Sequence, residues 1–208
     1  MSTISGKKKT GISLKKILIL FAHPALQKSR INNRLIEDLG TLDGVKIHDL
    51  YQAYPEFDID IQQEQALLTE HDIIVMHHPF FWYSTPAILK EWQDLVLSHG
   101  WAFGSEGNEL KGKIMFNALT AGGSKEAYSP EGYNRFTIRE LLAPLEQTAR
   151  LCKMIYLPPF AVHGTHAISQ EDVLQYKQAY RELLTKFRDD RINISQAEKL
   201  TYLNEYSG

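Results

Sequence analysis

The sequence predicts one α/β domain: a five-stranded parallel sheet with helices on both faces. Short apolar runs of strand length alternate with stretches of helical periodicity along the chain. The 208 residues are 43% hydrophobic and 23% charged, which is typical of a globular domain that needs no disulfide or metal for stability. Cys152 is the only cysteine, so an intrachain disulfide and a cysteine-cluster metal site are excluded.

The first half of the chain contains three predicted strands, over residues 17–21, 45–50 and 72–77. The first is a continuous apolar run, as in a strand buried on both faces. We expect a helix over residues 29–39, because Ile31, Leu35 and Leu39 share one helical face, and a short helix over 61–69. Thr85-Pro86 is a typical helix start. The inward residues of that helix, which ends near Gly100, should be Ile88, Trp92, Leu95 and Val96.

The second half contains two predicted strands, over residues 113–119 and 151–157, the latter ended by Pro158-Pro159. Between them we expect a helix over 137–149 that Pro144 kinks. A last helix begins after Ser169. Its buried stripe should be Val173, Tyr176, Tyr180, Leu183, Leu184 and Phe187. The chain thus divides into a basic arm (1–14), a domain (15–190) and a polar C-terminal tail (191–208).

The charge is unevenly distributed along the chain. Residues 1–16 carry five of the 23 basic residues and no acidic residue, so the remainder carries 18 basic and 25 acidic residues, a net charge of −7. A body of this charge does not fit a nucleic-acid-binding protein. We expect the arm to be either a solvated terminus or a segment that touches an anionic membrane or another chain.

No segment predicts export or membrane insertion. The apolar run after the lysines is only six residues long and His23-Pro24 follows it, whereas a signal peptide needs about 7–15 apolar residues. No other run approaches the ~20 residues of a membrane span. We therefore expect a cytoplasmic protein. The basic arm could also attach it to the inner face of the membrane as a peripheral protein.

In a parallel sheet, ligands bind beyond the carboxyl ends of the strands, so the loops after the first, third and fourth strands are the candidates. The first loop leads to Ser29, a typical N-cap, with Lys28 and Arg30 beside it. A helix start with nearby cations suits a phosphate monoester, although an ordinary capped helix has the same pattern. The loop lacks both the dinucleotide G-x-G-x-x-G fingerprint and the P-loop pattern.

The other two loops contain aromatic residues and glycines. Four consecutive aromatic residues, Phe80 to Tyr83, follow the third strand and cannot all face one core, so we expect some to be exposed and to stack on a flat ligand. Packing against helices or a second subunit is the alternative. In the fourth loop, Gly122 and Gly123 allow close backbone approach to a ligand, although ordinary turns also use such pairs.

These loops carry motifs that resemble one known family. The motifs are His23-Pro24 with Ser29-x-x-Asn32, His78-Pro79-Phe80-Phe81-Trp82-Tyr83-Ser84-x-Pro86, Ser98-His99-Gly100-Trp101, and Thr120-x-Gly122-Gly123. Together they resemble the flavodoxin-like NAD(P)H:quinone oxidoreductases, in particular the bacterial enzymes that also serve as ancillary subunits of glutathione-gated potassium-efflux systems. The resemblance spans about residues 15–187.

The resemblance implies a sheet order of 2-1-3-4-5, FMN as cofactor, NADH or NADPH as co-substrate, a quinone acceptor, a homodimer and a two-electron ping-pong reaction. Three groups of flavin-binding residues carry over to this chain. They are His23, Ser29, Arg30, Ile31 and Asn32 for the phosphate and ribityl chain; Phe80, Phe81, Trp82 and Tyr83 for one wall of the ring site; and Thr120, Ala121, Gly122 and Gly123 for the pyrimidine edge. The candidate walls of the substrate pocket are Trp101, Phe103, Tyr128, Phe160 and His163.

One departure concerns charge relay. The larger animal-type quinone reductases use a Tyr and a His after the Gly-Gly turn. Tyr128 stands at the Tyr position of this sequence, but Asn134 stands at the His position, and Asn does not exchange a proton at neutral pH. Tyr128 is therefore our single catalytic candidate, and we expect solvent or His163 to replace the missing His.

Other chemistries have weaker support. His77-His78 should point to opposite faces of a strand, so they do not converge on a metal, and His163-x-x-His166 lacks the H-E-x-x-H pattern.

Two other functions compete with the enzyme. One is a regulatory ancillary subunit of a glutathione-gated potassium-efflux transporter, with the flavin as ligand or sensor. The other is a one-electron flavodoxin-type carrier, against which the aromatic loop and the small net charge argue.

Overall fold

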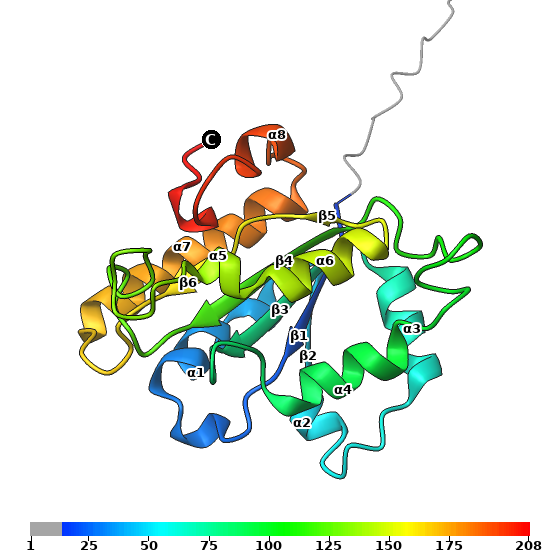
Figure 1. Ribbon diagram of the computed structural model, residues 1–208, viewed down its shortest axis with the longest axis horizontal. Coiled ribbons are helices and arrows are strands. Elements are labelled where there is room, and N and C mark those ends of the chain that lie inside the picture. Colours follow the sequence, from blue (N-terminus) through cyan, green and yellow to red (C-terminus); the bar gives the residue numbers. More distant parts are fainter. Residues whose placement is uncertain (1–13) are drawn as a thin grey trace, which may run out of the picture.

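The computed structural model describes residues 14–208 and confirms the predicted α/β architecture (Figure 1). The strands are β1 (Ile17–Phe21), β2 (Val45–Asp49), β3 (Ile73–Pro79), β4 (Ile114–Thr120), β5 (Ile155–Tyr156) and β6 (Phe160–Val162). They run parallel in the order β2-β1-β3-β4-β5, and β6 also pairs with β4. The arm predicted over residues 1–14 lies outside the described residues apart from Leu14.

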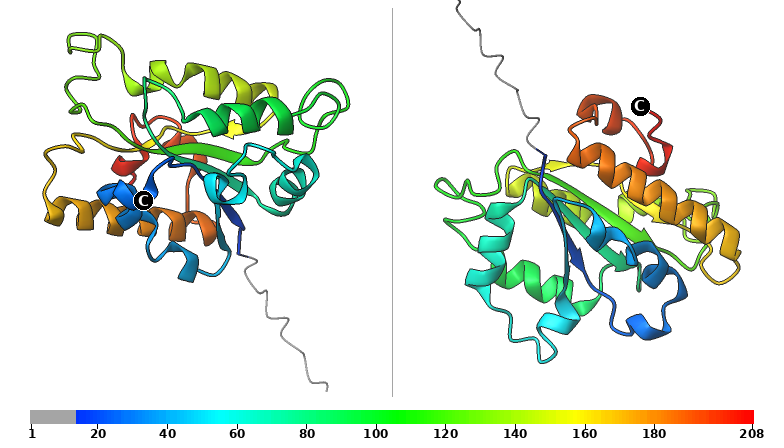
Figure 2. Two further views of the ribbon diagram at one scale, coloured as in Figure 1. Left: turned by 90° about the horizontal axis from the view of Figure 1, so that it is seen from below. Right: turned by 180° about the vertical axis from the view of Figure 1, so that it is seen from behind.

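Helices form a layer on each face of the sheet (Figure 2). The α-helices are α1 (Arg30–Ile36), α2 (Leu50–Ala53), α3 (Ile61–Glu70), α4 (Ala87–Val96), α5 (Ile138–Leu141), α6 (Ala143–Leu151), α7 (Gln170–Arg188) and α8 (Ile194–Ala197). Helices α1 and α7 cover one face, and α2 to α6 cover the other. Within residues 14–208, none of these helices is long and apolar enough to span a bilayer.

Each strand divides its side chains between two cores. In β1, Ile17, Ile19 and Phe21 pack toward α1 and α7, whereas Leu18 and Leu20 pack toward α3 and α4. All five are fully buried, which explains why the strand is apolar throughout rather than alternating. The strand therefore holds the start of the first loop rigidly at the carboxyl edge of the sheet.

Several predicted boundaries are wrong. The helix expected over 29–39 ends at Ile36, and Leu39 begins a 3₁₀ turn, η2 (Leu39–Thr41). The helix expected over 137–149 is two helices, broken at Leu142, with Pro144 in the first turn of α6. In α4, Leu95 is 36% exposed rather than inward, and the helix begins at Ala87 after Pro86.

The predicted strand over residues 151–157 is also wrong. Leu151 still belongs to α6, and only Ile155–Tyr156 pairs with the start of β4. The chain then passes Pro158-Pro159, which have no N–H to donate to a ladder, and pairs again with the end of β4 as β6. The last strand of the sheet is thus interrupted, and its second part brings residues after Val162 to the carboxyl edge.

Residues 191–208, expected as a polar tail, lie against the domain. Ala197, Tyr202 and Leu203 are buried, and a 3₁₀ turn, η3 (Leu203–Glu205), contacts β6. The side chain of Asn204 accepts from the N–H of Ala161 at 2.9 Å and donates to its C=O at 3.1 Å. Asn204 therefore satisfies backbone groups of an edge strand that would otherwise be open to pairing with another chain.

Candidate functional site

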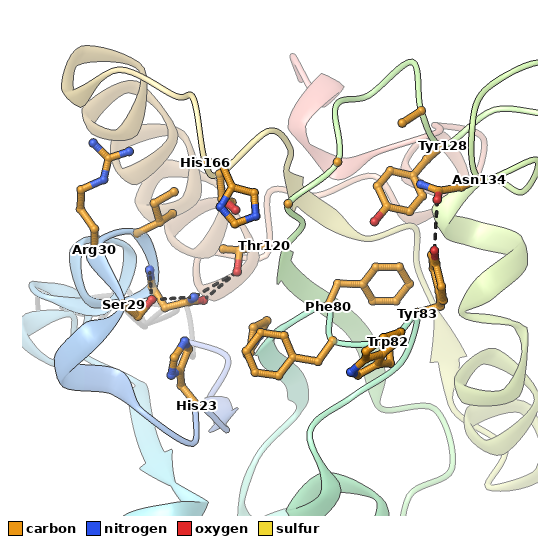
Figure 3. A pocket seen from close by; sticks show the side chains of 18 of the residues that line it. His23, Ser29, Arg30, Phe80, Trp82, Tyr83, Thr120, Tyr128, Asn134 and His166 are labelled. Carbon is orange, nitrogen blue, oxygen red and sulfur yellow. Dashed lines mark hydrogen bonds between the residues drawn. The ribbon is translucent and has the colours of Figure 1, made fainter.

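A cavity of about 850 Å³ lies at the carboxyl ends of β1, β3 and β4 (Figure 3). These three strands are neighbours in the sheet and end at Phe21, Pro79 and Thr120. The three loops that the sequence singled out therefore meet at one edge, as expected for a doubly wound sheet.

Most of the sequence-predicted site residues line this cavity. They are His23, Ser29, Arg30, Ile31, Asn32, Phe80, Phe81, Trp82, Tyr83, Thr120, Gly122, Gly123 and Tyr128. Ala121 does not line it; it is fully buried in the core under α4 and α6. The sequence analysis named Lys28 as a cation beside Ser29, Pro79 as part of a motif and Asn134 at the position of the relay His, but it assigned none of them to the flavin. It gave no site role to the other lining residues, which are Ala127, Tyr133, Thr165 and His166.

The first loop supplies hydrogen-bond donors and positive charge. Ser29 caps α1, and its Oγ accepts from the N–H of Asn32 at 3.2 Å. His23 accepts from the N–H of Ala25 on Nδ1 at 3.1 Å, which leaves the proton on Nε2. Burial lowers the pKa of His23, so the ring is neutral at pH 7. Lys28 and Arg30 line the cavity, and no acidic residue among residues 14–208 does, an arrangement that favours an anion.

The loop after β3 presents its aromatic rings to solvent, as expected. Phe80 is anchored in the core, whereas Phe81 and Tyr83 are half-exposed and Trp82 is 92% exposed. Trp82 and Tyr83 both have left-handed backbone angles, with φ of 47° and 64°, and Ser84 donates its N–H to the C=O of Phe81 at 2.9 Å. Left-handed geometry is costly for aromatic residues and often marks a functional loop.

The loop after β4 brings bare backbone to the cavity. The N–H groups of Gly122 and Gly123 have no hydrogen-bond partner within residues 14–208. A Cβ on Gly122 would lie 2.7 Å from His166 Nε2, and one on Gly123 would lie 3.0 Å from Tyr128 Cε2. Neither residue has a left-handed φ, so space rather than backbone conformation requires glycine here. The turn leaves room and two donors for a ligand edge.

Tyr128 lies in the cavity wall, but the group expected beside it is different. The ring of Tyr128 is 6.0 Å from that of Phe80, and burial raises its pKa. Asn134 lines the cavity and accepts a hydrogen bond from Tyr83 at 3.3 Å (Figure 3). His163, expected as its replacement, does not line the cavity, and its Nε2 is buried without a partner among the described residues. His166, three residues later, does line it.

The other candidate wall residues lie elsewhere. Phe160 is buried and stacks on Tyr180 with ring centroids 4.9 Å apart, whereas Trp101 and Phe103 pack against the core under α4. None of these three residues lines the cavity.

A model of the protein family described as "Flavodoxin-like fold" matches residues 15–184, which is most of the chain. Among curated proteins, the chain is 43% identical over 177 residues to the glutathione-regulated potassium-efflux system ancillary protein KefF of Klebsiella aerogenes. That match covers 85% of this chain and 99% of KefF.

Two solved structures have the same arrangement. General stress protein 14 from Treponema denticola, in complex with FMN, superposes with a TM-score of 0.76 at 34% identity, covering 83% of this chain and 97% of that one. An NADPH-quinone reductase from P. pentosaceus superposes with a TM-score of 0.74 at 32% identity, covering 80% and 96%.

Proposed function

This chain belongs to the flavodoxin-like fold family, and on that premise we propose that it is an FMN-dependent NAD(P)H:quinone oxidoreductase. The observation that carries the proposal is the composition of the cavity: hydrogen-bond donors and cations at one end, aromatic rings along a wall, and a bare Gly-Gly turn at the other side. Its relatives include a protein complexed with FMN and an NADPH-quinone reductase.

The residues present fit a flavin mononucleotide. The N-cap of α1 with His23 and Arg30 suits a phosphate monoester, and a Cβ at Gly122 or Gly123 would fill the space that the ring edge needs. The first loop has no fingerprint for an adenosine half, which favours FMN over FAD. The Phe80 to Tyr83 segment would form one wall of the ring site, and Thr120 with the glycines would hold the pyrimidine edge.

When bound, FMN would supply the redox chemistry of hydride transfer from a nicotinamide to a quinone. The protein itself would position the flavin and supply the electrostatic field around the ring. The free N–H groups of Gly122 and Gly123 are fixed donors, and such donors stabilise negative charge that develops on a ring edge during reduction. The aromatic wall gives flat substrates a surface for stacking.

Proton exchange in this cavity falls to His166 rather than to Asn134. The Asn134 amide neither binds nor releases a proton at neutral pH, whereas an imidazole ring can carry a proton on either nitrogen. His166 faces the cavity beside Gly122 (Figure 3). Replacing His166 by Gln should therefore lower turnover with little loss of bound FMN. Asn134→Ala, which removes the partner of Tyr83, is the matched comparison and should affect substrate KM more than kcat.

We also propose that the protein is a homodimer whose interface covers the cavity mouth. Trp82 and Tyr133 line the cavity yet are 92% and 91% exposed, and Phe136 nearby in sequence is 54% exposed. Exposed aromatic rings of this kind are typical of interface cores. A second chain over this mouth would complete the wall of the site.

Two measurements test the enzymatic proposal. Acid release of the cofactor followed by chromatography should yield one FMN per chain, and FAD or no flavin would count against it. Steady-state rates at varied NAD(P)H and quinone should give the parallel double-reciprocal lines of a ping-pong reaction. Comparing NADH with NADPH in the same assay identifies the preferred co-substrate.

A second candidate function is regulation of a potassium-efflux transporter, and the observation that favours it is the likeness to KefF. The lysine-rich arm is a candidate contact with such a transporter or with anionic lipid. A cytoplasmic protein would meet the transporter and the lipid at the inner face of the membrane. Potassium efflux measured with and without this protein, in cells that contain a glutathione-gated transporter, tests this role separately from quinone reduction.

A further inference from the structure

A buried chain of polar side chains lies directly beneath the cavity. His77, near the end of β3, is fully buried and does not line the cavity. Its Nε2 is 3.2 Å from Oδ1 of Asn32, which lies in the first turn of α1 and is 3% exposed. The two residues join the central strand of the sheet to the start of α1.

The other end of the Asn32 amide contacts two hydroxyl groups at the cavity surface. Its Nδ2 donates to Ser29 Oγ at 3.0 Å and to Thr120 Oγ1 at 3.0 Å. Figure 3 shows these bonds running from Ser29 across to Thr120, on the side of the cavity occupied by His23 and Arg30. One amide therefore contacts hydroxyls from two of the three site loops.

The orientation of that amide decides which way the hydroxyl protons point. A carboxamide has one donor end and one acceptor end, whereas a hydroxyl can both donate and accept. Ser29 Oγ accepts from Nδ2 and also from the N–H of Asn32, so both of its lone pairs are used. Its proton is then free to be donated into the cavity, where an anionic oxygen is the best acceptor.

The His77 ring is what holds the amide in this orientation. Turning the amide over would place Nδ2 against His77 Nε2, and the ring proton would have to move to Nδ1. Nδ1 is buried and has no partner among the described residues, and the His77 ring packs edge-on against the rings of Phe21 and Tyr180. An unpaired N–H at this buried position is costly. Burial lowers the pKa of His77 to about 3, so the ring is neutral and has a single N–H.

We propose that His77 is a positioning residue for the flavin phosphate: its Nε2–H fixes the Asn32 amide, which turns the Ser29 hydroxyl into a donor toward an anionic oxygen. The Thr120 hydroxyl is not part of this role, because it donates back to Asn32 Oδ1 at 3.4 Å. The inference rests on the proposed function, because it assigns the phosphate monoester of FMN to this end of the cavity. It predicts that His77 contributes to the affinity for the phosphate of FMN and not to the affinity for the rest of the flavin.

The fold provides a matched control in the next residue. His78 is also fully buried, and its Nε2 is 3.0 Å from Oδ1 of Asn117, whose Nδ2 donates to Tyr156 at 2.7 Å. This pair repeats the His–Asn contact on the opposite face of the sheet, with the difference that His78 Nδ1 also lies 3.0 Å from the C=O of Pro79. His78, Asn117 and Tyr156 do not line the cavity. Replacing His78 should therefore reproduce any general damage to the core without touching the phosphate end.

The test compares FMN with riboflavin, which lacks only the phosphate, by titrating flavin-free protein and following flavin fluorescence. In His77→Leu, the affinity for FMN should fall about tenfold or more, as for loss of a hydrogen bond to a charged group, with riboflavin affinity little changed. His77→Gln, whose amide can donate to Asn32, should keep most of the preference for FMN. His78→Leu should lower the thermal midpoint and keep the wild-type ratio of the two affinities.

A direct readout of the ring does not depend on how well the variants fold. In ¹⁵N-histidine NMR spectra of the wild-type protein, assigned by the signal missing from His77→Gln, His77 should carry its proton on Nε2. A proton on Nδ1, an equal loss of both flavins in His77→Leu, or a changed ratio in His78→Leu would overturn the inference. If the wild-type protein prefers FMN and His77→Leu does too, only this inference fails; if it binds neither flavin, the proposed function fails with it.

Discussion

Lowering the pH from 6.5 to 5.0 should destabilise the folded protein, because buried histidines must stay neutral. Burial lowers the pKa of His77 to about 3 and that of His163 to about 4. In the unfolded chain both rings bind a proton below about pH 6.5. A folded pKa below the unfolded one means that the stability is fully present above pH 6.5 and is lost as the pH falls toward the folded pKa.

The size of the effect follows from linkage. Each pH unit well inside this window costs about 1.4 kcal/mol per histidine, so lowering the pH from 6.5 to 5.0 costs about 1.7 kcal/mol for each of the two rings. Burial also lowers the pKa of His23, His71 and His78, so these rings add to the total. The pKa of Glu64 is also lowered, but a carboxyl of this kind loses its contribution only below about pH 4.5. The window between pH 6.5 and 5.0 therefore isolates the histidines.

Urea unfolding of flavin-free protein at several pH values measures this dependence without a contribution from bound ligand. His77→Leu should reduce the wild-type loss of stability between pH 6.5 and 5.0 by about 1.7 kcal/mol and leave the part due to the other histidines. An unfolding free energy that varies by less than about 1 kcal/mol between pH 6.5 and 5.0, or a slope unchanged in His77→Leu, would refute the assignment of neutral buried rings.

Three further predictions concern the site and the arm. Gly123→Val should weaken FMN binding more than tenfold, while the thermal midpoint of the apoprotein moves only a few degrees. The reason is that the added Cβ would lie 3.0 Å from Tyr128 Cε2 at the cavity surface. An equal loss of FMN affinity and of thermal stability would make the turn purely structural. Trp82→Ser should shift the protein from dimer to monomer in sedimentation velocity, and an unchanged dimer would remove the shared-mouth proposal. Deleting residues 1–13 should leave quinone reduction intact but weaken salt-sensitive binding to anionic vesicles, by about 1 kcal/mol per lysine at low salt; full-length protein that ignores such vesicles would leave the arm without this role.

Local sequence pattern was sufficient for the sheet and for the loops that meet at its edge. Ile17–Phe21 is apolar at every position because both faces of the strand are buried. The sites after Phe21, Pro79 and Thr120 were predictable because parallel strands place their carboxyl ends on one edge.

What escaped prediction depends on contacts between distant residues. His77 and Asn32 are 45 positions apart, and no periodicity links them. The interrupted last strand arises because Pro158-Pro159 breaks a ladder that β6 then resumes. The same break determines which histidine faces the cavity, so His163 was favoured over His166 from sequence alone.

The packing of residues 191–208 was equally hidden. Tyr202 and Leu203 are isolated apolar residues in a polar stretch, and such pairs carry no helical or strand period. Their burial becomes apparent only once the edge of β6 is known, because Asn204 pairs with the backbone of Ala161 there.

The central claim, that this cavity binds FMN for hydride transfer between a nicotinamide and a quinone, is tested most directly by following the two half-reactions separately. The FMN-loaded protein is mixed anaerobically with a small excess of NADH or NADPH, and a quinone is added after the nicotinamide has been removed. The account predicts that the flavin absorbance is bleached by at least one of the two nicotinamides and returns fully with the quinone. A flavin that neither nicotinamide bleaches, or a bleached flavin that the quinone does not restore, would contradict it.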